Sequence, residues 1–121
     1  MNEYKARAEA VRHAEVYRDS FALAVCPSAN LESPTIVGAQ AANELLNING
    51  VKASIVFTYF NNEVYLSARS IDEVNVQLIM EKLGGGGHMT IAGAQLKDIS
   101  IEDAIELVKK TLDSMIEEGE I

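Results

Sequence analysis

Four consecutive glycines followed by a histidine, Gly84–His88, are the residues of this sequence best suited to bind an anion. Without Cβ atoms, consecutive glycines let backbone N–H groups approach an oxyanion closely. His88 can donate a further hydrogen bond to a phosphate oxygen, most strongly when it is protonated, and Thr90 adds a hydroxyl. One interpretation is therefore a phosphate-binding loop. The alternative is that Gly84 ends a helix and the other three glycines form a turn.

Two well-known phosphate loops do not match this segment. The Walker pattern ends in Gly-Lys-Ser/Thr, whereas this run ends in Gly-His. The dinucleotide-binding pattern needs spaced glycines between a strand and a helix, whereas these glycines follow a predicted helix. A loop of another kind has to account for them.

Arg69, in the segment "SARS" at the predicted end of a strand, is the second residue suited to phosphate. Its planar guanidinium matches the geometry of phosphate oxygens. One predicted helix of about a dozen residues separates Arg69 from the glycines, so a compact fold allows Arg69 and His88 to lie at the same edge. The alternative is a surface ion pair of Arg69 with Asp72 or Glu73.

Residues for cleaving a phosphodiester are missing from the pattern. Such hydrolysis usually needs metal ions held by aspartates and histidines. The two histidines, His13 and His88, are far apart, and the five aspartates form no cluster along the sequence. No paired carboxylates suggest acid–base catalysis, and no serine or cysteine has an evident histidine base. The sequence predicts a domain that holds a phosphate, with no catalytic residue and no metal ligand of its own.

Length and charge narrow the class of ligand. The 121 residues fit one domain, and 18 acidic residues against 10 basic ones give a net charge of −8. A long nucleic acid is disfavoured because its binding normally requires a basic face, whereas a small anion needs only a few local donors. The single cysteine, Cys26, excludes an internal disulfide and favours the cytoplasm. Its apolar neighbours "FALAVC" predict a buried thiol.

The elements that must position these residues alternate between helix and strand. We expect helices over 3–17, from Ser33-Pro34 to about residue 49, over 72–83 and after the capping residue Ser100. Strands are expected over 21–26, 51–60, 63–70 and 92–97, with Asn61-Asn62 as a hairpin turn. Because side chains alternate along a strand, Val64, Leu66 and Ala68 are expected on one face of the 63–70 strand. Tyr65, Ser67 and Arg69 are then expected on the opposite face. The prediction is a single α/β domain with a small mixed sheet covered by helices.

Several of these segments resemble a known family. "SARS", "VNVQLIMEKLGGGGHMTIAGAQL" and the closing amphipathic helix are similar to the C-terminal DHH-associated domain of DHH-family phosphoesterases, whose hallmark is Gly-Gly-Gly-His followed by small residues. The upstream segment "SPTIVGAQAANELLNINGVKASIVF" makes the sequence most similar to cyclic-di-AMP phosphodiesterases of the GdpP type. The resemblance covers about residue 20 to the end. It implies an N-terminal helix over 1–19, linking to an absent DHH domain, and a DHH-associated substrate-binding domain over 20–121.

The resemblance also implies a function. In such enzymes the DHH domain holds two metal ions, usually manganese, and the associated domain closes over the cleft and grips the substrate. Carried onto this sequence, Gly85, Gly86, Gly87 and His88 contact phosphate, with Arg69 beside them. Ser70 and Asn75 are weaker candidates for the same pocket. The implied reaction is the hydrolysis of cyclic di-AMP to pApA by a metal-dependent phosphodiesterase.

An excised domain is the further implication, with Met1 as an added start codon. We then expect this fragment to be inactive alone and to bind no cofactor, with Mn²⁺ held in the absent DHH domain. Its expected partners are a cyclic dinucleotide or short nucleotide phosphodiester and the DHH domain of the same parent chain, with a homodimer left open. The expected location is cytoplasmic, with a parent anchored in the membrane through N-terminal segments. Alternatives are the same domain from a nanoRNase, pAp phosphatase or RecJ-like exonuclease, a stand-alone module that binds a nucleotide or a protein, and a structural domain with a glycine hinge.

Overall fold

A computed structural model describes residues 2–71 and 73–121. These residues form one six-stranded mixed sheet in the order β1-β2-β3-β4-β6-β5, together with four helices, which confirms the predicted α/β class. The helices are α1 (Glu3–Arg12), α2 (Pro34–Leu45), α3 (Val76–Lys82) and α4 (Ile101–Glu117). The strands are β1 (Glu15–Tyr17), β2 (Phe21–Cys26), β3 (Ala53–Phe60), β4 (Glu63–Ser70), β5 (Gly86–Gly87) and β6 (Ile91–Lys97).

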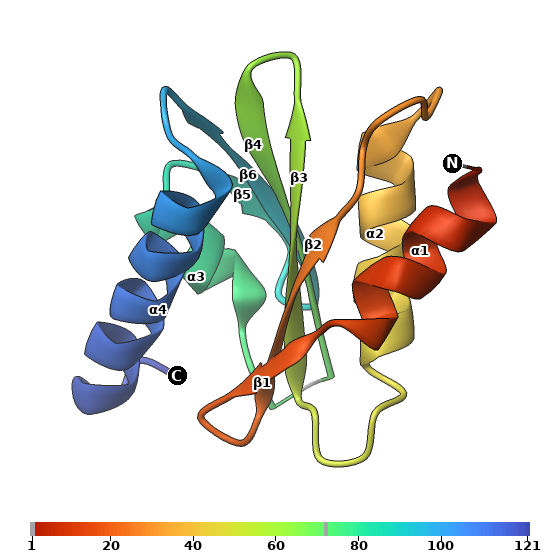
Figure 1. The fold of residues 1–121 in the computed structure, drawn as a ribbon. Coiled ribbons are helices and arrows are strands. Elements are labelled where there is room, and N and C mark those ends of the chain that lie inside the picture. The colour runs from red at the N-terminus through yellow and green to blue at the C-terminus, as the bar shows by residue number, and fades with distance from the viewer. Residues whose placement is uncertain (1, 72) are drawn as a thin grey trace.

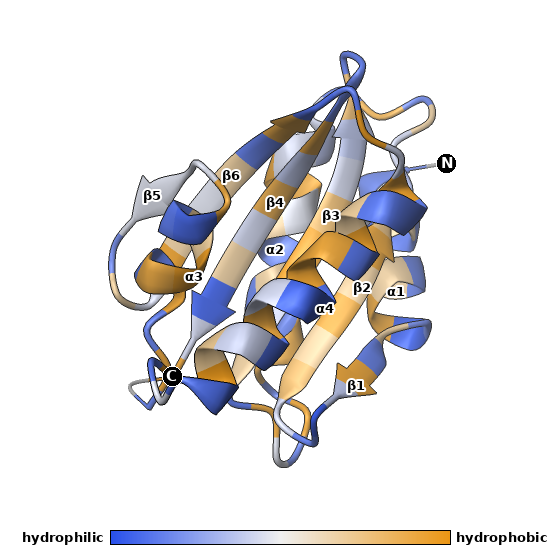
Figure 2. Cartoon of the chain, turned by 90° about the vertical axis from the view of Figure 1, so that its left-hand side faces the viewer, coloured by the Kyte–Doolittle hydropathy of each residue, from blue (hydrophilic) through white to orange (hydrophobic). Residues whose placement is uncertain are grey.

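The sheet separates two helical layers, each with its own hydrophobic core. Helices α1 and α2 lie on one face, and α3 and α4 lie on the other (Figure 1). Figure 2 looks onto the α3/α4 layer, with the other two helices behind the sheet. Strands β2 and β3 run parallel with α2 as their crossover, and the remaining pairs are antiparallel. Along each strand, successive side chains point alternately into one core and the other.

Helix α2 rests directly on β3. A Cβ atom added to Gly38 would lie 2.5 Å from the Thr58 hydroxyl oxygen, so the helix approaches the strand as closely as a glycine allows. The buried Ser54 hydroxyl donates a 2.6 Å hydrogen bond to the Ala42 carbonyl one turn further along α2. These contacts fix the helix over β3. On β6, the side chains of Ile91 and Gln95 that point to this face remain exposed.

The N-terminal helix is shorter than predicted. It ends at Arg12, and Glu15–Tyr17 pairs with β2 as an edge strand. Valine and tyrosine favour strands, and Arg18 and Asp19 turn the chain with positive φ angles of 49° and 63°. The prediction of a helix to residue 17 was wrong because Glu15–Tyr17 folds back onto the next strand, β2, in a tight hairpin.

A clasp joins this hairpin to the last helix, and we define it by Tyr17, Arg18 and Asp113. The Tyr17 hydroxyl donates to Asp113 at 2.7 Å, across 96 positions of sequence, and Arg18 pairs with the same carboxylate at 2.9 Å. The hydrogen bond to the ionised carboxylate is the main reason that the pKa of the Tyr17 phenol is raised. Lys109 Nζ lies 3.0 Å from Glu15, next to the clasp.

Other boundaries follow local capping. Helix α2 ends at Leu45 rather than near residue 49, and α3 begins at Val76 rather than at residue 72, which itself lies outside the described residues. The later start of α3 follows from Asn75, whose side chain accepts the Leu78 N–H at 3.3 Å and so caps the helix. The Asn61-Asn62 turn, with both φ angles positive, and the Ser100 cap are confirmed.

Cys26 is buried, as predicted, and burial raises the pKa of its thiol to about 11. Over the described residues, no helix has both the length and the apolar character needed to cross a bilayer.

The close contact of α2 with β3 generates a stability prediction. Gly38→Ala is expected to lower the free energy of unfolding by about 1–3 kcal/mol, because its methyl group must displace the Thr58 side chain. Urea denaturation measures the change. The control is a double-mutant cycle with Thr58→Ala, in which the same alanine costs less because the hydroxyl is gone. Equal effects of Gly38→Ala in both backgrounds would contradict the proposed contact.

Candidate functional site

Three side chains from neighbouring strands line up at one end of the sheet. Arg69 on β4 is the register partner of Ile91 on β6. The N–H of His88, just after β5, donates to the Ile91 carbonyl at 2.7 Å. Because cross-strand partners share a face, Arg69, Ile91 and His88 form one row, which we call the cationic row. With strands about 4.8 Å apart, the row spans about 10 Å between its outer Cα atoms.

The cationic row lies on the face that carries α2, beyond the part that α2 covers. Arg69 is also the register partner of Ser54, whose hydroxyl bonds to α2. His88 is exposed, Arg69 is half-buried, and 52% of Ile91 is exposed. The open end of this face therefore presents a guanidinium and an imidazole on either side of an exposed apolar side chain.

Arg69 is positioned by its own strand. Its Nη1 donates to the Ala68 carbonyl at 2.9 Å, and partial burial lowers the pKa of the guanidinium, which still stays charged at neutral pH. Of the two acidic residues considered as surface partners, Glu73 pairs with Lys52 at 2.8 Å. The other, Asp72, lies outside the described residues.

The first two glycines of the run end α3. Gly84 has a φ of +86° and donates its N–H to the Glu81 carbonyl, and Gly85 donates to the Met80 carbonyl at 2.8 Å. This is the hydrogen-bond pattern of a helix C-cap with glycine in the left-handed region. The interpretation of Gly84 as a helix end is confirmed, and the N–H groups of Gly84 and Gly85 are satisfied at the end of α3.

Two glycines of the run pack against β6. A Cβ on Gly85 would overlap the Gly93 carbonyl oxygen and lie 2.6 Å from the Ala94 Cβ. Gly87 has a φ of +141°, and a Cβ there would lie 2.5 Å from the Ala92 Cα. Around Gly86, by contrast, the space is open. The run therefore lets β5 approach β6 closely, at the small residues Ala92, Gly93 and Ala94.

Strand pairing also decides which glycine N–H groups can reach a ligand. Antiparallel strands alternate between hydrogen-bonded and non-bonded pairs. Because His88 bonds to Ile91, the next bonded pair is Gly86 with Gly93, and the intervening Gly87 has its N–H directed away from β6. An anion at this loop would meet the Gly87 N–H and the His88 side chain, rather than a nest of four N–H groups.

Two other residues that were predicted to contact substrate, Ser70 and Asn75, hold the turn after His88 in place. Ser70 is buried, its hydroxyl donates to the Val74 carbonyl at 2.6 Å, and its N–H donates to the Thr90 carbonyl at 3.0 Å. Asn75 caps α3, and the next N–H, of Val76, donates to the Met89 carbonyl. Ser70, Asn75 and the Thr90 backbone thus position the turn. Spacing in the sequence gave no signal of the two backbone bonds to Thr90 and Met89, because these bonds span the whole of α3.

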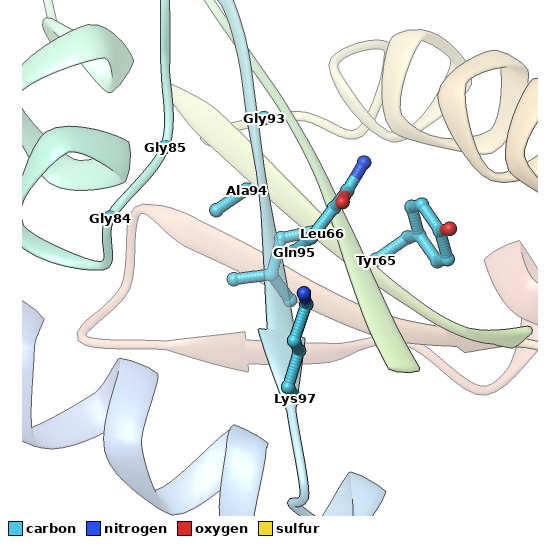
Figure 3. Close-up of a pocket in the computed structure, with 8 residues that line it drawn as sticks. All are labelled: Tyr65, Leu66, Gly84, Gly85, Gly93, Ala94, Gln95 and Lys97. Atoms are coloured by element: carbon cyan, nitrogen blue, oxygen red, sulfur yellow. The ribbon is translucent and has the colours of Figure 1, made fainter. Parts of the chain in front are cut away.

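A hollow of about 420 Å³ lies along β6 between Gly93 and Lys97 (Figure 3). In Figure 3, the Gln95 amide and the Tyr65 ring lie on one side of β6, and Gly84 and Gly85 lie on the other. The lining residues are Tyr65, Leu66, Gly84, Gly85, Gly93, Ala94, Gln95 and Lys97. Sequence reasoning did not single out Tyr65 or Gln95. Their alternation with buried neighbours was the available signal.

Within residues 2–71 and 73–121, no group of three or more histidine, cysteine, aspartate or glutamate side chains could hold a metal ion. The described residues therefore do not fit a manganese centre.

The fold and site define an α/β domain whose open sheet end presents an arginine, a histidine and a tightly packed glycine hairpin. A family model described as "DHHA1 domain" matches residues 23–118. The chain belongs to the DHHA1 domain family.

Two relatives are similar to this chain in sequence, and one solved structure is similar in fold. "Cyclic-di-AMP phosphodiesterase GdpP" of Bacillus subtilis is 40% identical over 98% of this chain and 18% of its own length. "Cyclic-di-AMP phosphodiesterase PdeA" of Listeria monocytogenes is 41% identical over 89% of this chain and 16% of its length. This chain thus spans less than a fifth of either relative. An exopolyphosphatase-related protein from Bacteroides fragilis shares the fold, with a TM-score of 0.80, 18% identity, and coverage of 93% of this chain and 34% of that one.

Neighbouring glycines provide a matched test of the hairpin. Gly85→Ala is expected to lower the free energy of unfolding by about 1–3 kcal/mol, since its methyl group collides with the β6 backbone. Gly86→Ala should change it by less than about 0.5 kcal/mol, because its methyl group enters open space. Urea denaturation of both variants measures the difference. A Gly86→Ala variant as unstable as Gly85→Ala would contradict the described packing.

Proposed function

We propose that this domain is the substrate-binding part of a phosphodiesterase that hydrolyses cyclic di-AMP to pApA. The observation that carries the proposal is the cationic row, in which Arg69 and His88 stand in register at the open end of the sheet. The names of the two relatives, both cyclic-di-AMP phosphodiesterases, support the choice of substrate.

In the proposed complex, a phosphate of the substrate lies over the row. The Arg69 guanidinium approaches its oxygens from one side and the His88 imidazole from the other, as charge-assisted or neutral hydrogen-bond donors. The Gly87 N–H, directed away from β6, points away from a phosphate over the row and is available only to an oxyanion at the outer edge of β5. Of the other predicted contacts, Gly85 and Gly86 shape the hairpin, and Ser70, Asn75 and Thr90 hold its turn in place.

Bond cleavage is assigned to another part of the parent protein. The described residues offer no ligand set for manganese. We therefore place Mn²⁺ and the attacking water in a DHH domain of the longer parent protein. Under this proposal the present 121 residues hold the substrate and do not cut it. We place this domain in the cytoplasm because its one cysteine suits a reducing compartment.

Substitutions in the cationic row test substrate binding. Calorimetric titration with cyclic di-AMP and pApA should show that Arg69→Ala and His88→Ala each weaken binding roughly tenfold or more, the effect of losing one hydrogen bond to a charged group. Arg12→Ala, an exposed arginine on α1 that pairs with Glu9, is the matched control and should bind like the original protein. Unchanged affinity in both row variants would refute the assigned phosphate site.

Two further measurements separate the parts of the proposal. Tighter binding of pAp or short RNA than of cyclic di-AMP would keep the phosphate site and replace the substrate. Manganese-dependent hydrolysis of cyclic di-AMP by these 121 residues alone would refute the assignment of cleavage to another domain.

A further inference from the structure

A strip of β6 extends from Ile91, in the middle of the cationic row, toward Lys97 and lies open to solvent. Ile91, Gly93 and Gln95 alternate along the strand toward the face that carries α2, because residues two apart share a face. Helix α2 rests on β3 and leaves this strip uncovered: Ile91 and Gln95 are exposed, and Gly93 is half-exposed. Such an open face next to a phosphate site is available to the rest of a nucleotide.

The strip has a flat floor between two side chains. At about 3.3 Å per residue, Ile91 and Gln95 lie about 13 Å apart along β6. Gly93, midway between them, adds only a hydrogen atom on this face. Its register partner on β4, Ser67, is also small. A planar ring can therefore lie on the strand backbone with the Ile91 side chain against one end.

Gln95 closes the other end with a polar group. Its register partner is Tyr65, and in Figure 3 the Gln95 amide and the Tyr65 ring lie on the same side of β6. The Tyr65 hydroxyl donates to Glu63 at 3.1 Å and its ring centroid lies 6.2 Å from that of Phe60, so the phenol is held beside β4 and leaves the strip open. The Gln95 amide carries both a donor and an acceptor, the pair that matches the N6 amino group and N7 of adenine. Guanine offers two acceptors at the corresponding edge, which suits Arg or Lys better.

We propose that the strip of Ile91, Gly93 and Gln95 binds the nucleobase of the substrate and that Gln95 makes the site prefer adenine to guanine. The inference rests on the proposed function, since the phosphate over Arg69 and His88 sets which end of the strip the sugar enters. Ile91 then provides apolar contact to the base next to that phosphate, and Gln95 reads its edge.

Titration of this chain with AMP, GMP and ribose 5-phosphate tests the strip apart from the phosphate site. The original protein should bind AMP more tightly than GMP, and both more tightly than ribose 5-phosphate. Ile91→Ser should weaken AMP binding about five- to tenfold more than it weakens ribose 5-phosphate binding, because only the base loses the apolar area of this side chain. Gln95→Ala should reduce the preference for AMP over GMP at least about fivefold.

Matched controls are Ile36→Ser, an isoleucine on α2 that is 56% exposed, and Gln77→Ala on α3, and both should bind all three ligands like the original protein. Equal affinity for AMP and ribose 5-phosphate would overturn the base site while leaving the phosphate site intact. No change in the AMP-to-GMP ratio in Gln95→Ala would overturn the role of Gln95. Binding of none of the three ligands would refute the proposed function, and the strip with it.

Discussion

The close approach of the glycine segment to β6 is the constraint on which this site depends. Gly85 and Gly87 have no room for a Cβ atom, so β5 can form only because these positions are glycine. Once it forms, the hydrogen-bond ladder fixes His88 opposite Ile91, and Ile91 is already opposite Arg69. The glycines thus act first on backbone pairing, and the alignment of two distant polar side chains follows from that pairing.

The helices cover the two faces of the sheet unequally, and this leaves Arg69 and His88 accessible to solvent. On one face, α3 and α4 bury the apolar positions of β3, β4 and β6 in a single core. On the other, α2 is held to β3 by the Gly38–Thr58 contact and the Ser54–Ala42 hydrogen bond. The far end of β6 is left bare on that side. One small residue in a helix, three strands away from His88, thereby helps to decide where a ligand can lie.

Local sequence signals predicted much of this arrangement. Alternation placed Val64, Leu66 and Ala68 on the buried face of β4, and the structure confirms it. The asparagine turn and the Ser100 cap depend on side chains within three residues, so their signals are complete in the sequence. Arg69 could be placed at a strand end for the same reason.

An unmarked turn and tertiary packing decided what the sequence did not predict. The strand at Glu15–Tyr17 pairs with β2 through the turn at Arg18 and Asp19, and this turn contains no glycine, proline or asparagine that would mark it in the sequence. Ser70 looked like a ligand contact, but its hydroxyl faces Val74 inside the fold. Ile91 carried no signal at all, because an isoleucine in a strand is usually core and its exposure depends on where α2 stops.

The clasp between Tyr17 and Asp113 bears on how the chain reaches this fold. Its hydrogen bond spans 96 positions, and the parallel β2–β3 pair also joins segments separated by a whole helix. Contacts between distant segments must overcome loop-closure entropy before they contribute stability, so a high mean sequence separation slows folding. The β3–β4 hairpin, closed by two asparagines, has no such delay. The strand that carries Arg69 is therefore expected to pair early, and the attachment of the last helix to β1 to come late.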